Sequence, residues 1–272
     1  MEHYRVKPDS AVDLGDHDAG DSGDAETKEG AAERSAVLAK KLDVLQERLY
    51  AESSRSVLVV LQGIDAAGKD GTIRHVMGAL NPQGCVVTSF KAPTPQETAH
   101  DFLWRIHNAC PAAGYIGIFN RSHYEDVIVT RVHGLITRKE AEVRFGLIRD
   151  FEKILADRGV RVLKFLLHLS EAEQKKRLLE RLDDPSKRWK FSAGDLKERG
   201  FWKAYQKAFE EVLSETSTRQ APWFVVPADR KWYRNLVVAD VLVDALEEMD
   251  PRAPKKGGMD WKGLRRAVSG TE

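Results

Sequence analysis

Residues 63–72 read GIDAAGKDGT, and this stretch decides the expected fold. Gly63, Gly68 and Lys69 have the spacing Gly-x-x-x-x-Gly-Lys of a phosphate-binding loop. The loop follows a continuous apolar run, SVLVVLQG at 56–63, which is typical of a parallel strand buried on both faces. A helix is expected directly after the loop, so its N-terminus would face a bound phosphate.

Two aspartates distinguish this loop from the usual form. The residue after Lys69 is normally a Ser or Thr whose hydroxyl binds Mg²⁺, but here it is Asp70, and Asp65 lies inside the loop. A carboxylate beside phosphate is costly unless a cation lies between them, and Mg²⁺ binds through one or two carboxylates plus substrate phosphates. We therefore expect Asp65 to be a metal ligand, whereas Asp70 can equally be a helix-start residue that favours the dipole.

The loop as a whole is expected to bind phosphate. A glycine-rich strand-to-helix turn with a surface lysine is the alternative interpretation of the same pattern. The residues expected to form the phosphate site are Gly63, Ala66, Ala67, Gly68, Lys69, Asp70, Gly71 and Thr72.

The rest of the chain alternates between apolar runs and helical patterns. Four further strands are expected, at 85–90, 115–119, 160–170 and 223–227. Helical patterns occur before the first strand, at 31–50, and between later strands, at 95–108 and at 137–159, where Gly159 is the expected stop. Such alternation predicts an α/β fold with three layers, in which helices cover both faces of a five-stranded parallel sheet. Ligands of these sheets bind at the carboxyl ends of the strands.

A second polar loop follows the expected strand at 115–119. It reads NRSHYED from Asn120 to Asp126, and it should open on the same sheet edge as the first loop. Arg121 can bind a phosphate with two parallel hydrogen bonds, and Asp126 can be a second carboxylate near the metal. Ser122 and Glu125 fit a capping box, which leaves Arg121 and Asp126 unexplained. We expect His123 and His133 to be packing or surface residues.

The segment at 171–199 is highly charged, with nine basic and seven acidic residues, and contains Pro185 and Gly194. A flexible basic segment after the fourth strand could close over phosphates as a lid, although a solvated charged helix is the commoner meaning of such a run. The expected lid residues are Arg177, Arg181, Lys187 and Arg188.

The two ends of the chain differ in charge. Residues 1–30 hold nine acidic and three basic residues, which predicts a disordered acidic tail. Residues 251–272 hold six basic and two acidic residues, so a basic C-terminal tail is expected there. The folded unit should therefore cover residues 31–250.

Composition excludes several classes of protein. Only Cys85 and Cys110 are present, so a disulfide framework is not implied and a reducing cytoplasm is expected. The first ten residues, MEHYRVKPDS, lack the apolar core of a signal peptide, and no apolar run is long enough to cross a membrane. Nucleic acid is not an expected partner, because no series of stacking aromatic residues accompanies the basic segments.

The motifs GIDAAGKDGT, SFKAP, FNRSHYEDV and KRLLERLDDPSKRWKFSAGD together resemble the polyphosphate kinase type 2 family over residues 35–250. FNRSHYEDV is similar to the subgroup called class III, which phosphorylates nucleoside mono- and diphosphates; other subgroups tend to carry Asn at the position of Glu125. The resemblance implies a P-loop kinase fold like that of thymidylate kinase, with a helical lid. It also implies transfer of phosphate from inorganic polyphosphate to AMP or ADP, with GMP and GDP left open.

The resemblance assigns roles to residues and partners. Asp65 and Asp126 would hold Mg²⁺, with Mn²⁺ as a substitute, and Lys69 and Arg121 would bind the transferring phosphates. Further phosphate or nucleotide contacts are expected at Lys91, Asn120 and Arg131. Family members of this kind suggest a homo-oligomer, with a tetramer as the first candidate.

Two other functions remain open on the sequence alone. One is an ordinary ATP-dependent nucleoside or nucleotide kinase of the same fold. The other is a non-catalytic regulatory module that binds polyphosphate or nucleotide. The presence of all four charged residues Asp65, Lys69, Arg121 and Asp126 argues against loss of catalysis.

Overall fold

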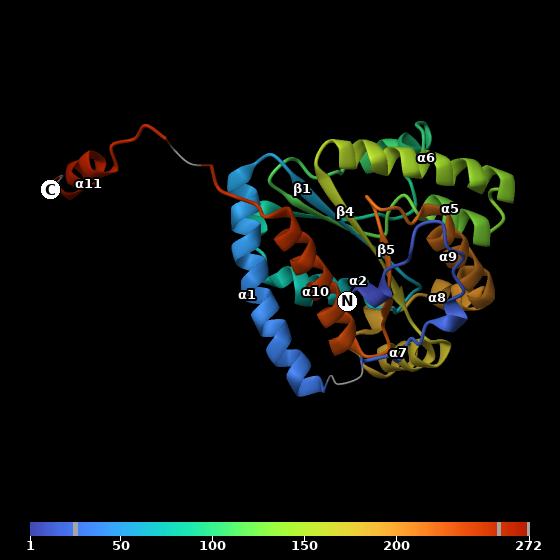
Figure 1. Cartoon of the computed structure of the whole chain (residues 1–272). Helices are drawn as coiled ribbons and strands as arrows, with labels where there is room; N and C mark the ends of the chain where they lie inside the picture. The colour runs from blue at the N-terminus through green and yellow to red at the C-terminus, as the bar shows by residue number, and fades with distance from the viewer. Residues whose placement is uncertain (24–26, 255–256, 271–272) are drawn as a thin grey trace.

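The computed structural model describes residues 1–23, 27–254 and 257–270. Its centre is a five-stranded sheet of order β2-β3-β1-β4-β5, and every pair of neighbours is parallel (Figure 1). The strands are β1 (Ser56–Gln62), β2 (Cys85–Ser89), β3 (Ile116–Asn120), β4 (Val160–His168) and β5 (Trp223–Pro227). All seven residues of β1 are buried, as expected for a central strand covered on both faces. The predicted five-stranded parallel sheet is confirmed, with strand ends displaced by one or two residues.

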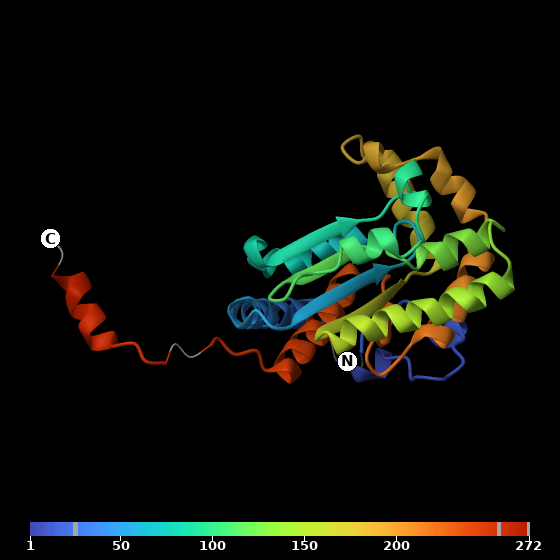
Figure 2. The same cartoon turned by 90° about the horizontal axis from the view of Figure 1, so that it is seen from above.

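Helices cover both faces of the sheet. On one face α1 (Lys28–Glu52) lies beside α10 (Lys231–Met249), which also contacts α2 (Lys69–Val76). On the other face α5 (Glu125–Val132), α6 (Arg138–Asp157) and α9 (Trp202–Thr216) pack against one another (Figure 2). The core between these layers is one continuous cluster of aliphatic and aromatic side chains.

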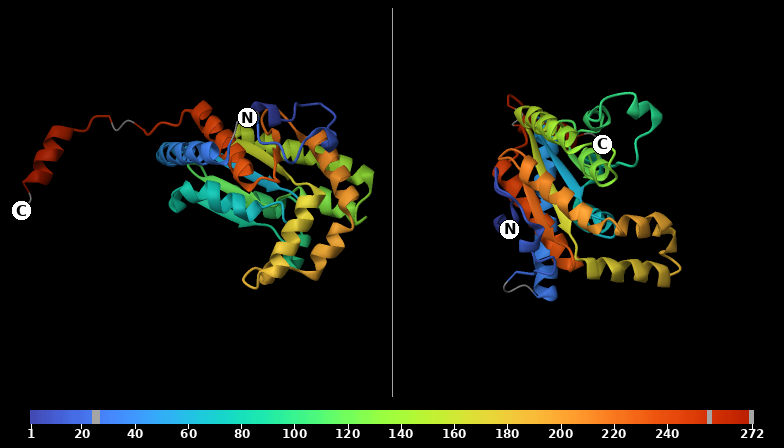
Figure 3. Two further views of the ribbon diagram at one scale, coloured as in Figure 1. Left: turned by 90° about the horizontal axis from the view of Figure 1, so that it is seen from below. Right: turned by 90° about the vertical axis from the view of Figure 1, so that its right-hand side faces the viewer.

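The expected basic segment forms two helices joined by a short loop. These are α7 (Glu171–Asp183) and α8 (Ala193–Arg199), with a 3₁₀ turn, η5, at Arg188–Lys190 between them. Figure 3 shows both helices projecting together from one side of the domain. Helix α7 ends at Asp183, two residues before Pro185, and the role of this segment as a lid stays a prediction.

The helix expected over 95–108 is divided into two short helices. Thr94 and Glu97 form a capping box that begins α3 (Pro95–Thr98). The Asp101 carboxylate then accepts a hydrogen bond from the Leu103 amide at 2.9 Å, and a new helix, α4 (Trp104–Asn108), follows. The Asp101 side chain thus bonds to the backbone two residues on, and such a local bond competes with the continuous helix that periodicity alone predicts.

The first 23 residues are packed on the domain, which contradicts the disordered tail predicted for residues 1–30. Tyr4, Val6 and Leu14 are buried in the core cluster. The Val6 amide donates to the Trp223 carbonyl at 2.9 Å, and the Tyr4 hydroxyl donates to Asp21 Oδ2 at 2.5 Å and is hydrogen-bonded to the Tyr233 hydroxyl at 2.9 Å. Acidic composition predicted disorder because apolar residues are sparse in this segment, yet the few that occur reach the core. Residues 24–26 of the predicted tail lie outside the described residues.

Replacement of Tyr4 by Ala should destabilise the protein. We expect Tyr4→Ala to lower the free energy of unfolding by about 3 kcal/mol, because a buried aromatic ring is lost and its hydrogen-bond partners are left behind. Urea unfolding followed by circular dichroism measures the change. Tyr50→Ala is the control, since Tyr50 is 44% exposed and should cost much less. An unchanged urea midpoint for Tyr4→Ala would mean that this segment does not pack in solution.

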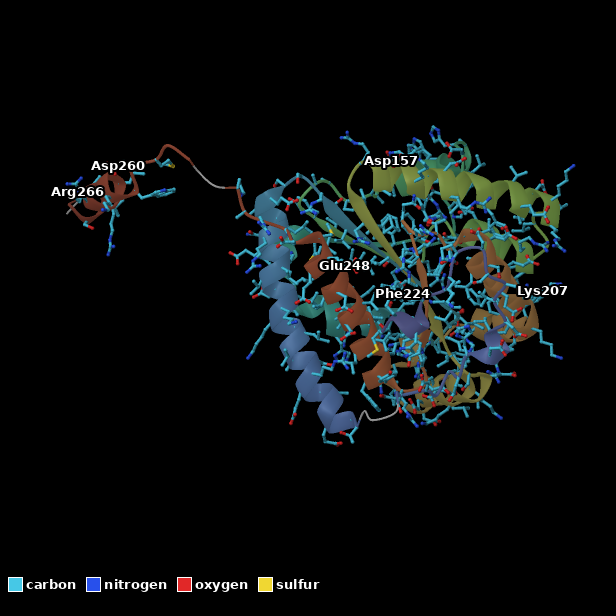
Figure 4. The ribbon with its side chains drawn as sticks, in the orientation of Figure 1. Asp157, Lys207, Phe224, Glu248, Asp260 and Arg266 are labelled. Carbon is cyan, nitrogen blue, oxygen red and sulfur yellow. The ribbon has the colours of Figure 1, made fainter. Side chains whose placement is uncertain are left out.

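The C-terminal residues lie apart from the α/β domain. Helix α11 (Trp261–Ser269) has no buried residue, and Figure 4 shows its Asp260 cap and Arg266 well away from Phe224 in the sheet. Within the described parts of the chain, none of the helices has both the length and the apolar content needed to cross a bilayer.

Candidate active site

The loop between β1 and α2 has the strained backbone of a phosphate-binding turn. Gly63 and Gly68 have φ values of 151° and 105°, and Ala66 has φ 67°, in the left-handed region that non-glycine residues rarely adopt. A Cβ atom at position 63 would lie 2.9 Å from the Leu167 carbonyl oxygen, and one at position 68 would overlap the Arg234 guanidinium. Both glycines are therefore required by space as well as by backbone conformation.

Lys69 begins α2 and closes the loop. Its Nζ donates to the Gly63 carbonyl at 2.6 Å and reaches the Ile64 carbonyl at 3.4 Å. Burial lowers the pKa of Lys69, and the positive charge of Arg121 lowers it further. The Thr72 hydroxyl donates to the Gly68 carbonyl at 3.2 Å, so this buried threonine stabilises the first helical turn.

The second loop meets the first, as the topology predicts. Because β1 and β3 are parallel neighbours, their carboxyl ends lie side by side. Arg121 follows β3 with φ 63°, and its Nη2 donates to Asp65 Oδ1 at 3.0 Å. The Asn120 side-chain amide donates to Asp70 Oδ1 at 2.8 Å. Each aspartate of the first loop is thus bound to a residue of the second loop.

Of the two neighbouring acids at the start of α5, Glu125 is the one that faces this group. Burial alone would lower the pKa of Arg121, but the negative charges of Glu125 and Asp65 raise it. Burial raises the pKa of Glu125 itself, although Arg121 and Lys69 oppose that change. Glu125, predicted only as a residue of substrate choice, therefore lies within the charge cluster of the site.

Asp126 faces a different set of groups. Its Oδ2 is 3.5 Å from Arg105 Nη2 and is buried without a hydrogen bond among the described residues. Burial raises the pKa of the Asp126 carboxyl, while Arg105 and Arg144 oppose the change. The structure thus pairs Asp126 with an arginine of α4 and does not bring it into the Asp65–Arg121 pair.

A buried polar network supports the second loop from beneath. Lys164 Nζ, on β4, donates to Glu152 Oε2 at 2.7 Å, to the Tyr124 hydroxyl at 2.8 Å and to the Thr216 carbonyl at 2.7 Å. Tyr124 and His123 also contact Glu152 Oε1, at 2.8 and 3.3 Å. Both side chains are fully buried, so His123 packs in the interior and does not lie on the surface. This network fixes His123 and Tyr124, two of the three residues that join Arg121 to Glu125.

The lid lies close to the phosphate loop through α8. Arg181 of α7 is 3.5 Å from Asp195 of α8. Burial raises the pKa of Asp195, and the negative charge of Asp65 raises it further, which indicates that the two carboxylates are near each other. Lys187 and Arg188 are exposed in the connecting loop, where Lys187 pairs with Asp184 at 2.6 Å and Arg188 donates to the Leu182 carbonyl at 2.8 Å.

Arg177 differs from the other predicted lid residues. It is buried, and its guanidinium donates to the carbonyls of Ala66, Ala67, Ala228 and Asp229 at 2.6–3.2 Å. Its guanidinium therefore lies against the back of the phosphate loop. It is not part of the exposed surface of the predicted lid.

Two other predicted phosphate contacts, Lys91 and Arg131, make hydrogen bonds or ion pairs with other groups. Lys91 is exposed after β2, and its carbonyl accepts a hydrogen bond from Arg105 at 2.9 Å. Arg131 lies at the end of α5, 3.9 Å from Glu211 and 3.5 Å from the Ile136 carbonyl. Their phosphate-binding roles stay predictions.

The donor set fits a divalent cation only in part. In residues 1–23, 27–254 and 257–270 no three His, Cys, Asp or Glu side chains are grouped so as to hold a metal. Asp65 has a partly exposed carboxylate beside the phosphate loop, so it fits a cation whose remaining ligands are substrate phosphates and water.

Comparison with known proteins then decides the family. A family model described as "Polyphosphate kinase 2 (PPK2)" matches residues 25–254. The chain belongs to the polyphosphate kinase 2 family. The resemblance seen in the sequence motifs is thereby confirmed.

Relatives in the polyphosphate kinase 2 family match almost the whole chain. An AMP/ADP-polyphosphate phosphotransferase of Meiothermus ruber is 51% identical over 256 residues, which cover 94% of this chain and 96% of that protein. An ADP-polyphosphate phosphotransferase of Rhodopseudomonas palustris is 44% identical, covering 93% and 91%. The crystal structure of polyphosphate kinase 2 from Arthrobacter aurescens TC1 has a TM-score of 0.96 at 44% identity and covers 99% of this chain and 96% of that chain.

Several residues of this polyphosphate kinase 2 site were not predicted from the sequence. Arg234 of α10 donates to the Ala67 carbonyl at 3.0 Å, and Gln174 of α7 donates to the Asp65 carbonyl at 3.1 Å. Both come from helices far along the chain and have no local motif. Asp195, by contrast, lies within the quoted lid motif, so its acidic character was visible there.

Proposed function

We propose that this chain is a polyphosphate-dependent nucleotide kinase. It transfers the terminal phosphate of inorganic polyphosphate to AMP and ADP, giving ADP and ATP, and the transfer is reversible. The observation that carries the proposal is the joining of the two loops through Arg121 and Asp65 beside Lys69, in a chain of this family. The name of the Meiothermus ruber relative supports AMP and ADP as acceptors.

The chemistry requires little acid–base help from the protein. An oxygen of the acceptor phosphate attacks the terminal phosphorus of polyphosphate, the bridging P–O bond breaks, and the shortened polyphosphate leaves with the bonding electrons. The attacking phosphate is largely ionised near neutral pH, since its second pKa is about 6. Alignment and neutralisation of charge should therefore dominate, and Lys69 and Arg121 are the cationic groups placed to provide them.

We also propose a divalent cation, Mg²⁺ with Mn²⁺ as a substitute, bound by Asp65 together with substrate phosphates. When bound, the cation neutralises charge on the two phosphate chains. Asp126 was the second metal ligand expected from the sequence, but its contact with Arg105 makes Asp65 the better supported of the two. Asn120 stays a candidate for phosphate or nucleotide contact, because it is bound to Asp70 at the same sheet edge.

The first test is direct. Purified protein is mixed with polyphosphate, Mg²⁺ and one of AMP, ADP, GMP or GDP, and the nucleotides are separated by chromatography. ADP and ATP formed from AMP alone support the proposal. Transfer only when ATP is supplied as donor would identify an ATP-dependent nucleotide kinase, and binding of polyphosphate without turnover would identify a regulatory module.

Glu125 should influence the choice between acceptors. We expect Glu125→Asn to lower the ratio of kcat/KM for AMP to that for ADP by about fivefold, which corresponds to about 1 kcal/mol of difference between the two transition states. Loss of a negative charge beside Lys69 and Arg121 makes the site more positive, which favours the more highly charged ADP. Steady-state kinetics with both acceptors measures the ratio.

The control for this ratio is Glu142→Gln, which removes the same charge from an exposed position on α6. It should leave the AMP to ADP ratio unchanged. An equal loss of both activities in Glu125→Asn would remove Glu125 from acceptor choice.

We further propose that the protein acts in the cytoplasm as a homo-oligomer, with a tetramer as the first candidate. Support comes from the resemblance noted in the sequence and from two cysteines that are both free. Light scattering after size-exclusion chromatography would give the number of subunits.

A further inference from the structure

Two buried arginines bind the back of the phosphate loop. Arg177 of α7 is 5% exposed and Arg234 of α10 is 2% exposed. The Ala67 carbonyl accepts from both, at 3.2 Å from Arg177 Nη1 and 3.0 Å from Arg234 Nη1. The Ala66 carbonyl accepts from Arg177 at 3.0 Å. The two side chains thus hold consecutive carbonyls of the loop from helices on different parts of the chain.

These contacts determine which way the loop amides point. In a trans peptide the C=O and the following N–H point in opposite directions. The Ala67 carbonyl faces the arginines, so the Gly68 amide faces away from them, on the side where a phosphate-binding loop takes its ligand. The preceding peptide is fixed as well, because the Ala67 amide donates to the Ile64 carbonyl at 3.1 Å.

The charge of Arg234 is not neutralised by a carboxylate among its contacts in the described chain. Arg177 pairs with Glu173 at 2.9 Å, whereas the Arg234 guanidinium contacts the Ala67 carbonyl and the Asn235 amide oxygen. Burial and the positive charge of Arg177 lower the pKa of Arg234 to about 10, so it still carries its proton near neutral pH. Burying such a cation is costly unless an anion compensates it.

The position of Arg234 adds to this cost. Its Nη2 lies 3.2 Å from the position of a Cβ at Gly71, and its Nη1 would overlap a Cβ at Gly68, so the guanidinium rests on the first turn of α2. The N-terminus of a helix is itself a region of partial positive charge, and a cation there is unfavourable. An anion bound by the loop would reduce the cost of burying the Arg234 charge and would offset its repulsion by the helix N-terminus.

We propose that Arg177 and Arg234 are positioning residues that hold the phosphate loop in its anion-binding form, and that the buried charge of Arg234 adds to the affinity of the loop for phosphate without touching it. The identity of the anion as a polyphosphate rests on the proposed function. The proposal that Arg177 and Arg234 clamp the loop, meaning that they hold it in this form, rests on their hydrogen bonds and on the burial of their guanidinium groups.

The test measures the dissociation constant of inorganic tripolyphosphate by isothermal titration calorimetry. We expect Arg234→Gln to weaken binding roughly tenfold, which corresponds to about 1.4 kcal/mol. Arg177→Lys should also weaken binding, because one ammonium group cannot bind four carbonyls. The matched control is Arg55→Lys, since Arg55 binds Glu52 and the Met249 carbonyl at the opposite end of β1. It should lower thermal stability and leave the dissociation constant unchanged.

A second variant separates charge from structure. Asn235→Asp keeps Arg234 in place and sets a carboxylate beside it, where the amide oxygen now lies 2.9 Å from Nη2. We expect this change to weaken tripolyphosphate binding several-fold while raising the melting temperature of the ligand-free protein. A purely structural role of Arg234 would leave binding intact in this variant.

The outcomes are distinct from those of the kinase assay. If Arg234→Gln and Asn235→Asp both fold and both bind tripolyphosphate as the parent protein does, the inference is wrong. If Arg234→Gln does not fold, the tripolyphosphate affinity of Asn235→Asp alone tests the inference, and unchanged affinity in that variant contradicts it. Parent protein that binds tripolyphosphate but transfers no phosphate to AMP would overturn the proposed function, and the effect of the variants on binding would still decide the clamp.

Discussion

Lys69→Met should reduce the rate of phosphate transfer from polyphosphate to AMP by roughly 100-fold to 1,000-fold, the usual cost of removing one preorganised charge-stabilising group. Lys69 is the buried cation at the start of α2, and its Nζ lies on the inner side of the loop between the Gly63 and Ile64 carbonyls. Bound phosphate would take over these contacts. The methionine keeps the length and the apolar stem of the lysine, so the loss should lie in the charge.

The rate is measured with saturating polyphosphate, and the fold is checked by circular dichroism. Lys153→Met is the matched control, because Lys153 is an exposed lysine on α6 that pairs only with Asp157 in the described structure. It should retain the parent rate. A Lys69→Met protein that folds and turns over at a near-normal rate would show that the loop does not act on phosphate.

Asp65→Asn should lower the rate about 100-fold at low Mg²⁺, since a catalytic cation supplies several kcal/mol of charge stabilisation. Part of the rate should return as the Mg²⁺ concentration is raised, because the weakened site would again be filled. The same change leaves Arg121 without the carboxylate that it contacts at 3.0 Å. The measurement is a Mg²⁺ titration of the transfer rate.

Two other acids provide the comparison for this titration. Asp70→Asn removes a carboxylate from the same loop, where it is bound to Asn120. Asp126→Asn removes the acid that the sequence favoured as a second ligand but that the structure places beside Arg105. We expect the Mg²⁺ midpoint to move most for Asp65→Asn. A larger shift for Asp126→Asn would assign the cation to the second loop.

The meeting of the two loops could be predicted from the sequence, because it depends on topology. Apolar runs at 56–62 and 116–120 are recognisable as buried parallel strands, and loops that follow such strands share one edge. Asp65 and Arg121 are therefore brought together by features that are each local in the sequence. The same holds for the strand–loop–helix unit around Gly68 and Lys69.

Which of two adjacent acids faces the site could not be predicted. Successive residues of an α-helix point about 100° apart, so Glu125 and Asp126 on α5 must face different groups. Packing sets how a helix is rotated about its own axis relative to the sheet. Here the packing is that of the buried cluster of Tyr124, Glu152 and Lys164 beneath the loop. Sequence spacing does not contain that information.

The lid arginines illustrate a related limit. Arg177 and Arg181 are four residues apart and share a helix face, as predicted. However, α7 is only partly covered by the domain, so Arg177 is buried against the phosphate loop while Arg181 pairs with Asp195 of the lid. Arg234 could not be recognised at all, because it lies in an ordinary helical pattern and its partner carbonyls are more than 150 residues away in the sequence.

The antiparallel bridge between Arg5 and Phe224 has a consequence for how the protein is made. The segment that covers the outer edge of β5 is synthesised early, whereas β5 leaves the ribosome only after nearly the whole folded unit. Until then Tyr4 and Val6 lack their hydrogen-bond partners, the Tyr233 hydroxyl and the Trp223 carbonyl. An exposed strand edge can recruit another chain, and docking of this segment covers part of the outer edge of β5.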